Sequence, residues 1–241
     1  MKLSVVIPAF NEERLLPATL AHLAAAIQAF EARGWAAEVI VCDNNSTDAT
    51  AQVARAAAAR VVFEPVNQIA RARNAGAAAA SGDWLLFVDA DCQPGVALFE
   101  DLFAAIERND GIGGGSTVAC DTNQLLVRAW VAAWNLLSRL TGWAAGCFLF
   151  CRADAFRAVG GFSEALYAAE EIDLSRRLSR YARERHKRFV ILHRHPVLTS
   201  ARKAKLYSAR EHAAFLLATL LSGGRSLRRR ESCGIWYDGR R

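Results

Sequence analysis

The sequence predicts an α/β fold, a Rossmann-like, doubly wound and mostly parallel sheet with helices on both faces. Short apolar runs alternate with stretches of helical periodicity, the order expected of parallel strands joined by crossover helices. The most informative run, residues 84–88, is unbroken and bulky, so it predicts a strand buried on both faces. It stops abruptly at two carboxylates, Asp89 and Asp91.

Length and composition suit one globular enzyme domain. The chain has 241 residues, 53% hydrophobic and 22% charged, enough to bury a core and too apolar for wholesale disorder. No apolar stretch reaches the ~18 residues that a membrane-spanning helix needs. Six cysteines without a C-x-x-C pair predict reduced thiols, and Pro8 interrupts the first apolar run too early for a secretory signal. A cytoplasmic location is therefore expected.

The formal net charge of +6 is concentrated at the C-terminal end. Residues 202–241 contain ten Lys or Arg and three Asp or Glu, so the rest of the chain is close to neutral. We expect a single domain over 1–222, with halves at about 1–110 and 111–222, and a basic tail at 223–241. Such a tail would attract an anionic surface, which suggests peripheral association with the inner face of a membrane rather than a nucleic-acid partner.

The first half of the chain predicts four strands with a helix after each of them. Pro8 and Asn11 end the first strand in a turn, and the short polar side chains of residues 43–48 favour a turn and a helix cap. The predicted strands are 3–7, 38–42, 61–63 and 84–88, and the helices are about 15–34, 49–59, 70–80 and 95–108.

The second half opens with Gly111–Gly115, which predicts a flexible junction. It resembles a phosphate-binding loop only in composition, because no Gly-Lys-Ser/Thr ends it. The strands predicted after it are 116–120, 148–151 and 189–192, and a helix is predicted to start near 168.

Two further stretches, 124–143 and 204–221, predict amphipathic helices. The first gathers apolar side chains on one side: Trp130, Trp134, Leu137 and Leu140. Packing into the core is the simplest explanation of that side. Contact with an apolar acceptor or a membrane is the alternative.

The two carboxylates after the 84–88 strand suggest a metal site. Alternate residues of an extended chain point the same way, so Asp89 and Asp91 can converge beyond the strand's carboxyl end. Two hard oxygen ligands suit Mg²⁺ or Mn²⁺, which keep water and share substrate phosphates. Ligands of open α/β sheets bind in that crevice. The alternative is an ordinary solvated turn.

Taken together, these segments resemble the inverting glycosyltransferases of family 2, which have the GT-A fold. The matches run in the expected order between residues 3 and 178. Besides the Asp-x-Asp strand they are SVVIPAFNEE at 4–13, EVIVCDNNSTDAT at 38–50, ARNAG at 72–76, AGCFLFCR at 145–152, GGF at 160–162 and EEIDL at 170–174.

The resemblance implies a nucleoside diphosphate sugar, UDP- or GDP-linked, as donor. It places Asp43 on the base, Arg73 near the diphosphate, and Mn²⁺ or Mg²⁺ on Asp89 and Asp91. Gln93 is implied as a third metal ligand; His193 or His195 is the rival, since imidazole suits Mn²⁺. The residues implied to bind the donor are Pro8, Ala9, Phe10, Glu12, Asp43, Arg73, Asp89 and Ala90.

The resemblance also implies a catalytic base, Glu171, which fills the second position of the family's Glu-Asp pair. That position is usually Asp, and the extra methylene extends the reach of the carboxylate by roughly 1–1.5 Å. The departure leaves Glu170 and Asp173 as alternative bases, and an acidic first turn of a helix as the structural alternative. Trp143 and Gly146 are implied to contact the acceptor.

The expected activity is transfer of a sugar to a hydroxyl or lipid-phosphate acceptor, in envelope glycan or glycolipid synthesis. A metal would neutralise the departing diphosphate while a base takes the acceptor's proton from the opposite face, which inverts the anomeric centre. A nucleotidyltransferase and a non-catalytic nucleotide-sugar binding protein are the alternatives. The first usually has a Gly-rich, Arg/Lys-bearing loop where this chain has PAFNEE.

Overall fold

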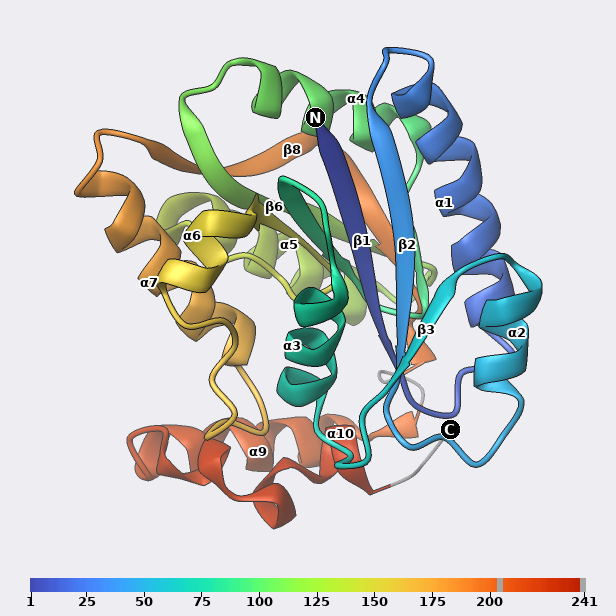
Figure 1. The fold of residues 1–241 in the computed structure, drawn as a ribbon. Coiled ribbons are helices and arrows are strands. Elements are labelled where there is room, and N and C mark those ends of the chain that lie inside the picture. The colour runs from blue at the N-terminus through green and yellow to red at the C-terminus, as the bar shows by residue number, and fades with distance from the viewer. Residues whose placement is uncertain (203–205, 239–241) are drawn as a thin grey trace.

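The computed structural model describes residues 1–202 and 206–238, and these contain one eight-stranded sheet (Figure 1). The strand order across the sheet is β3-β2-β1-β4-β7-β6-β8-β5. The strands are β1 (Lys2–Ala9), β2 (Ala36–Asp43), β3 (Arg60–Phe63), β4 (Trp84–Val88), β5 (Cys92–Gln93), β6 (Gly111–Cys120), β7 (Phe148–Arg152) and β8 (Arg188–Thr199).

The predicted mostly parallel sheet is confirmed. β3, β2, β1 and β4 are parallel to one another, and β6 is parallel to β8. β7 runs antiparallel between β4 and β6, and β5 antiparallel to the end of β8. Because β1 and β2 are in register, with Ala9 beside Asp43, the turns that follow them start at the same edge as the turn after β4.

Helices cover both faces of the sheet, as predicted, and give three layers (Figure 1). α1 and α4 pack on one face, and α3, α6 and α7 on the other. The helices are α1 (Leu16–Glu31), α2 (Thr50–Ala56), α3 (Ile69–Ala79), α4 (Val96–Glu107), α5 (Leu125–Thr141), α6 (Ala153–Ala158), α7 (Glu170–Arg183), α9 (Ala209–Leu221) and α10 (Gly234–Tyr237), with short 3₁₀ turns η1 (Arg225–Arg228) and η2 (Arg230–Cys233).

β4 is the centre of the core. All five of its residues are buried, which confirms the prediction of a strand covered on both faces. Its side chains alternate between the two layers: Leu86 and Val88 join the α1/α4 side, while Leu85 and Phe87 join the α3/α6/α7 side. The turn that carries Asp89 and Asp91 therefore starts from a firmly held strand end.

The glycine run Gly111–Gly115 is strand β6, not the flexible junction predicted from composition. The reason is steric. A Cβ added at Gly113 would lie 2.6 Å from the Phe150 carbonyl oxygen, and one at Gly114 would overlap the Val190 carbonyl oxygen. The absence of side chains lets β6 pass close to both of its neighbours, β7 and β8.

The prediction that the apolar side of 124–143 packs in the core holds only for Trp134, which is half-buried against the core. Ser138 is the only buried residue of α5, while Trp130 is 62% and Leu140 76% exposed. The second amphipathic helix, predicted at 204–221, is α9. Residues 203–205, at its predicted start, lie outside the described part of the chain. None of the helices in the described part is both long and apolar enough to cross a bilayer.

The predicted basic tail includes η1, η2 and α10, which lie across the carboxyl end of the sheet (Figure 1). The Tyr167 amide donates to the Leu227 carbonyl oxygen at 2.7 Å. Cys233 is fully buried. This segment therefore contributes to the walls at the edge where the predicted site residues lie.

Substituting Gly114 by Ala tests the close packing of β6. We expect the variant to lose about 1–3 kcal/mol of unfolding free energy, because the new methyl group meets rigid backbone. Gly111→Ala is the matched control in the same strand, since the nearest atom to its Cβ would be 3.6 Å away. Urea unfolding of both variants measures the difference, and equal stabilities would show that the strand spacing does not depend on Gly114.

Candidate active site

Two adjoining hollows open at the carboxyl ends of β1 and β4. The first, called the strand-end hollow, has a volume of about 100 Å³ and is lined by the segments that follow these strands and by C-terminal residues. The second, called the glutamate hollow, has a volume of about 250 Å³ and is lined by α3, α5 and the start of α7. Ile69, Asp89 and Trp236 line both hollows, which therefore share a wall.

Most of the residues predicted to bind a donor gather in the strand-end hollow. Asp43 does not line it: its Oδ1 accepts a hydrogen bond from the Ser46 amide at 3.0 Å and shapes the turn after β2. The neighbouring Asn44 lines the hollow instead. The predicted residues brought together here are Pro8, Ala9, Phe10, Glu12, Asp89, Ala90 and Asp91.

Arg73, on α3, is the buried cation between the two hollows. Its Nη2 lies 2.8 Å from Asp89 Oδ1 and its Nη1 lies 2.6 Å from Glu170 Oε1, while Nη2 also donates to the Gly146 carbonyl oxygen at 3.3 Å. Burial alone would lower the pKa of Arg73, but the charges of Asp89 and Glu170 raise it. Within the described residues its buried Nε has no hydrogen-bond partner.

Glu171, at the start of α7, faces the same glutamate hollow as Asp89. Burial, followed by the charge of Glu170, raises the pKa of Glu171 to about 8, although Arg73 acts in the opposite direction. Glu170 is itself held by Arg73. The Glu171 carboxyl can therefore exchange its proton near neutral pH.

Sequence reasoning missed a second cation, Arg202, which follows β8. Its guanidinium makes a two-pronged contact with Glu12, at 2.9 and 2.6 Å, and its Nη2 lies 3.6 Å from Asp91 Oδ2. The strand-end hollow thus holds the carboxylates of Glu12 and Asp91 around one arginine. No local pattern indicated this, because 190 residues separate Arg202 from Glu12.

Asp89 and Asp91 are the hard oxygen donors that Mg²⁺ or Mn²⁺ prefers. The structure does not supply the predicted third ligand from His195, whose Nδ1 lies 3.0 Å from Asp101 Oδ2 on α4. Gln93 pairs with Leu198 through the backbone and lines neither hollow. Across residues 1–202 and 206–238, no three His, Cys, Asp or Glu side chains could together hold a metal. Two carboxylates still fit an ion that takes its other ligands from water and phosphate oxygens.

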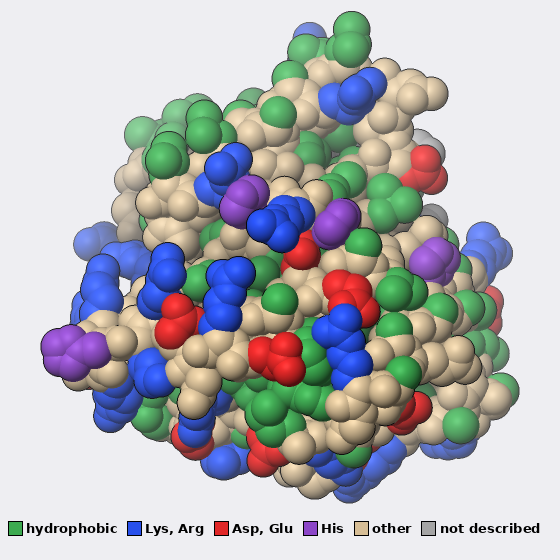
Figure 2. Space-filling view, turned by 90° about the horizontal axis from the view of Figure 1, so that it is seen from above, with side chains coloured by type: hydrophobic (Ala, Val, Ile, Leu, Met, Phe, Trp, Pro, Cys, Tyr) green, Lys and Arg blue, Asp and Glu red, His purple; other side chains and the backbone are tan. Residues whose placement is uncertain are grey.

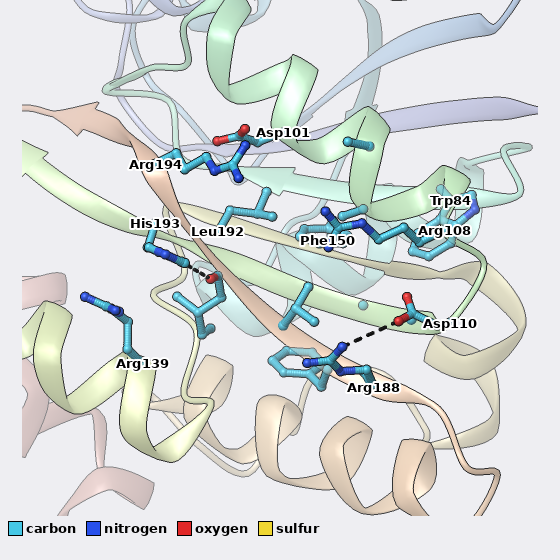
Figure 3. Close-up of a pocket in the computed structure, with 17 residues that line it drawn as sticks. Trp84, Asp101, Arg108, Asp110, Arg139, Phe150, Arg188, Leu192, His193 and Arg194 are labelled. Carbon is cyan, nitrogen blue, oxygen red and sulfur yellow. Dashed lines mark hydrogen bonds and ion pairs between the residues drawn. The ribbon is translucent and has the colours of Figure 1, made fainter.

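His193 and His195 belong to the other end of the sheet. A larger hollow of about 480 Å³ lies there, lined by His193, Arg194 and Asp101 among others (Figure 3). Figure 2 looks onto this side of the molecule, where arginine and histidine side chains gather at the surface. None of the predicted carboxylates lines it, so the size of a cavity does not identify the site in this chain.

Of the residues predicted to contact the acceptor or act as the base, some line the glutamate hollow and others do not. Gly146 lines the glutamate hollow, and a Cβ there would lie 2.5 Å from Arg73 Nη2, so the glycine makes room for the guanidinium. Trp143 does not line it. Asp173, one of the alternative bases, is paired with Arg177 at 2.7 Å and also lies outside the hollow.

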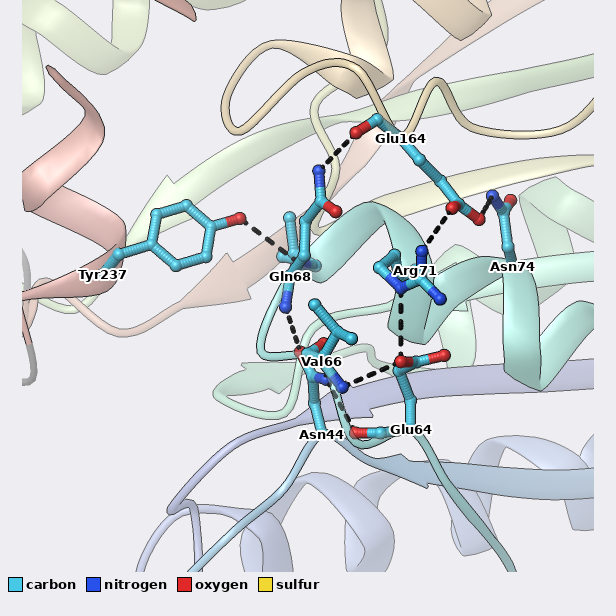
Figure 4. Close-up of polar contacts among 9 residues, drawn as sticks. Asn44, Glu64, Val66, Gln68, Arg71, Asn74, Glu164 and Tyr237 are labelled. Carbon is cyan, nitrogen blue, oxygen red and sulfur yellow. Dashed lines mark hydrogen bonds and ion pairs between the residues drawn. The ribbon is translucent and has the colours of Figure 1, made fainter. Parts of the chain in front are cut away.

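Aromatic side chains complete both hollows. Trp130 and Trp134 of α5 line the glutamate hollow; acceptor contact was the alternative that the sequence left open for this side of the helix. Trp236 and Tyr237 come from α10, where the sequence carried no clear signal. The Ile69 amide donates to the Tyr237 hydroxyl at 3.3 Å, beside the first turn of α3 (Figure 4).

Contacts around Tyr237 tie three segments together (Figure 4). The backbone amide of Gln68 donates to Asn44 Oδ1 at 2.9 Å. Its side-chain Nε2 donates to the Glu164 carbonyl oxygen at 2.7 Å. Asn44 Nδ2 donates to the Val66 carbonyl oxygen at 2.6 Å. The loop after β2, the start of α3 and the loop before α7 are thus fixed relative to one another at the rim of the strand-end hollow.

Known proteins resemble this chain in sequence and in fold. A sequence model described as Glycosyl transferase family 2 matches residues 4–156. An uncharacterised glycosyltransferase of Mycobacterium tuberculosis is 42% identical over 88 residues, 36% of this chain and 36% of that protein. The match thus spans about a third of the relative's length.

Solved structures share the fold. S. aureus TarS in complex with UDP-GlcNAc is 18% identical with a TM-score of 0.66, and the match covers 99% of this chain and 71% of TarS. Glucosyl-3-phosphoglycerate synthase from M. tuberculosis, solved with Mn²⁺, UDP and phosphoglyceric acid, is 23% identical with a TM-score of 0.63, covering 92% of this chain and 78% of the synthase. The predicted GT-A type of fold is confirmed.

Replacing Arg73 by Gln tests whether this cation holds the site together. We expect a loss of about 3–5 kcal/mol in unfolding free energy, because Glu170 would remain as a buried and uncompensated charge. Arg152→Gln is the control, since Arg152 and Asp154 form an ion pair with side chains 43% and 55% exposed and should contribute less than about 1 kcal/mol. Chemical denaturation of both variants gives the comparison; a small effect at Arg73 would contradict its central role.

Proposed function

The chain belongs to glycosyl transferase family 2, and we propose that it moves a sugar from a nucleoside diphosphate to an oxygen of its acceptor with inversion at the anomeric carbon. The observation that carries the proposal is the shared wall of the two hollows. Asp89 borders both, so a donor held at the strand ends would present its sugar toward Glu171. One attack from the face opposite the leaving diphosphate inverts the centre.

The donor is proposed to be a UDP-sugar lying along the strand-end hollow. TarS was solved with UDP-GlcNAc and the mycobacterial synthase with UDP, and both share the fold of this chain. Phe10 and Tyr237 offer aromatic surface for a base, and Asp89 and Asp91 belong to the same lining, from which Asp89 also borders the glutamate hollow. The guanidinium of Arg202 can bind diphosphate oxygens if it leaves Glu12.

Asp89 and Asp91 are proposed to hold Mg²⁺ or Mn²⁺, an ion that would act as a Lewis acid on the departing diphosphate when bound. The synthase neighbour was solved with Mn²⁺. Their oxygens suit such an ion, and diphosphate oxygens would complete its coordination. Arg202, 3.6 Å from Asp91, would then share that carboxylate or move away from it.

Glu171 is proposed as the base that takes the acceptor's proton. Arg73 neutralises Glu170 and Asp89, and Glu171 keeps a raised pKa of about 8 in the same hollow. A base whose pKa lies near the working pH is deprotonated in a useful fraction of the molecules and still binds the acceptor's proton strongly. Trp130 and Trp134 beside it fit an acceptor with an apolar or ring-shaped surface, as in a lipid-linked sugar or a glycan of the envelope.

Two substitutions separate binding from transfer. Asp91→Asn should remove the Mn²⁺-dependent part of donor binding, whereas Glu171→Gln should keep donor binding and lower the rate of transfer by about 10²–10⁴-fold. The first is measured as the change in melting temperature with UDP-sugars, with Mn²⁺ or with a chelator, and the second as release of UDP.

Asp173→Asn is the control for the base, because Asp173 lies outside the hollow and should retain transfer. If it loses as much activity as Glu171→Gln, the base is misassigned. Unchanged Mn²⁺-dependent binding by Asp91→Asn would refute the metal site.

The raised pKa of Glu171 also predicts a pH dependence of stability in the metal-free protein. Between pH 4.5, its ordinary pKa, and about 8, the folded state binds more protons than the unfolded state, so the unfolding free energy falls as pH rises. Glu171→Gln removes this effect. Its gain in melting temperature over the wild type should therefore grow from pH 5 to pH 8.5, while Glu184→Gln, whose carboxylate is 61% exposed, should show no such trend.

A further inference from the structure

α5 and α9 carry most of the exposed large apolar side chains in the described part of the chain. α5 has 17 residues and buries only Ser138, and no α9 side chain that the structure describes is buried. The side chains more than half exposed include Leu126, Leu136 and Leu140 of α5 and Leu217, Leu220 and Leu221 of α9.

Such helices lack the burial that ordinarily stabilises a helix of their length. Most helical stability in proteins comes from packing an apolar face, and isolated helices shorter than about 12–15 residues are marginal in water. Contiguous apolar surface on a protein usually marks a contact site. The leucines of α5 and α9 are therefore best explained as a contact site that another apolar surface covers.

α5 lines the glutamate hollow, and α9 contacts a residue of its wall. Trp130 of α5 lines the hollow while remaining 62% exposed. Phe215 of α9 packs against Trp236, with ring centroids 5.0 Å apart, and Trp236 lines the hollow from the other side. The apolar surfaces thus continue into the walls of the hollow that holds Glu171.

The charge beside these leucines is mostly positive, although α9 also contains Glu211 in its first turn. α5 contains Arg128 and Arg139 and no acidic residue, and α9 is followed by Arg225 and Arg228–Arg230. Leucines with arginines beside them are typical of helices that lie in the interface of an anionic bilayer. A second copy of this chain fits less well, because an α5 face against its equal would bring arginines together.

We propose that α5 and α9 dock the protein on an anionic lipid surface with the glutamate hollow turned toward the headgroups. This inference deepens the proposed function and rests on it for the acceptor class: an acceptor carried by a lipid would then enter between α5 and α10. Docking itself requires no turnover. It assigns membrane contact to α5, where the sequence left that contact as the alternative, and to α9. The sequence also pointed to the tail, whose residues 225–237 partly form the walls of the site.

The test is flotation of the full chain with vesicles of phosphatidylcholine alone or mixed with phosphatidylglycerol, without donor. We expect binding to the mixed vesicles and a blue shift of tryptophan emission that Trp130→Phe diminishes. Two triple variants, Leu126→Gln with Leu136→Gln and Leu140→Gln, and Leu217→Gln with Leu220→Gln and Leu221→Gln, should each bind about tenfold more weakly or worse.

Phe63→Gln combined with Val96→Gln is the matched control. These side chains are 59% and 43% exposed on β3 and α4, so the pair removes exposed apolar surface away from the two helices and should bind like the wild type. Because all the substituted leucines are exposed, the variants should fold, and their melting temperatures check this. Equal flotation of both triple variants and the wild type overturns the proposal, as does a wild type that binds no vesicles.

Two other outcomes are informative. Equal binding to neutral and anionic vesicles would overturn the electrostatic part. Self-association in light scattering that both triple variants abolish, with no vesicle binding, would make a second copy the occupant. Melting-temperature shifts with UDP-sugars on the same samples separate the two proposals: donor binding without docking refutes the docking alone, and docking without donor binding refutes the proposed function.

Discussion

The buried guanidinium of Arg73 is the contact on which the arrangement of the site depends. It holds Asp89, at the end of β4, and Glu170, at the start of α7, so it joins the strand-end hollow to the glutamate hollow. Three acids in a partly dry cleft would repel one another, and removing the cation would leave at least one uncompensated. Gly146 allows the close approach, since any side chain there would displace the guanidinium.

The same cation distinguishes Glu171, the base that the family resemblance implied, from its neighbour Glu170, which the sequence left as an alternative. Glu170 and Glu171 are adjacent and both near Arg73, but the hydrogen bond goes to Glu170. Glu171 keeps the cost of burial and the repulsion of its neighbour, which is why its pKa is raised to about 8. Asp173 lies outside this environment, because it pairs with Arg177 and does not line the glutamate hollow.

What the sequence could predict was set by local pattern. β4 and its carboxylates followed from an apolar run and a period of two, and Pro8 and Glu12 from a strand end that matched a family segment. Gly114 was misread because composition does not reveal how closely Val190 approaches. Arg202 and Tyr237 escaped notice because their partners, Glu12 and Ile69, are 190 and 168 residues away along the chain.

The exposed helices and the site are not separate features of this fold. Trp236 lines both hollows and rests on Phe215, so the position of α9 influences a wall that donor and acceptor would both meet. The leucines of α9 lie in water, while Phe215 packs on Trp236 and the capping box of Ser208 and Glu211 closes the first turn of the helix. Covering the leucines of α9 would remove apolar area from water and so stabilise the helix. The wall residue Trp236, which packs on α9, would be held more firmly as a result. A surface that carries the acceptor would then also order the cleft that receives it.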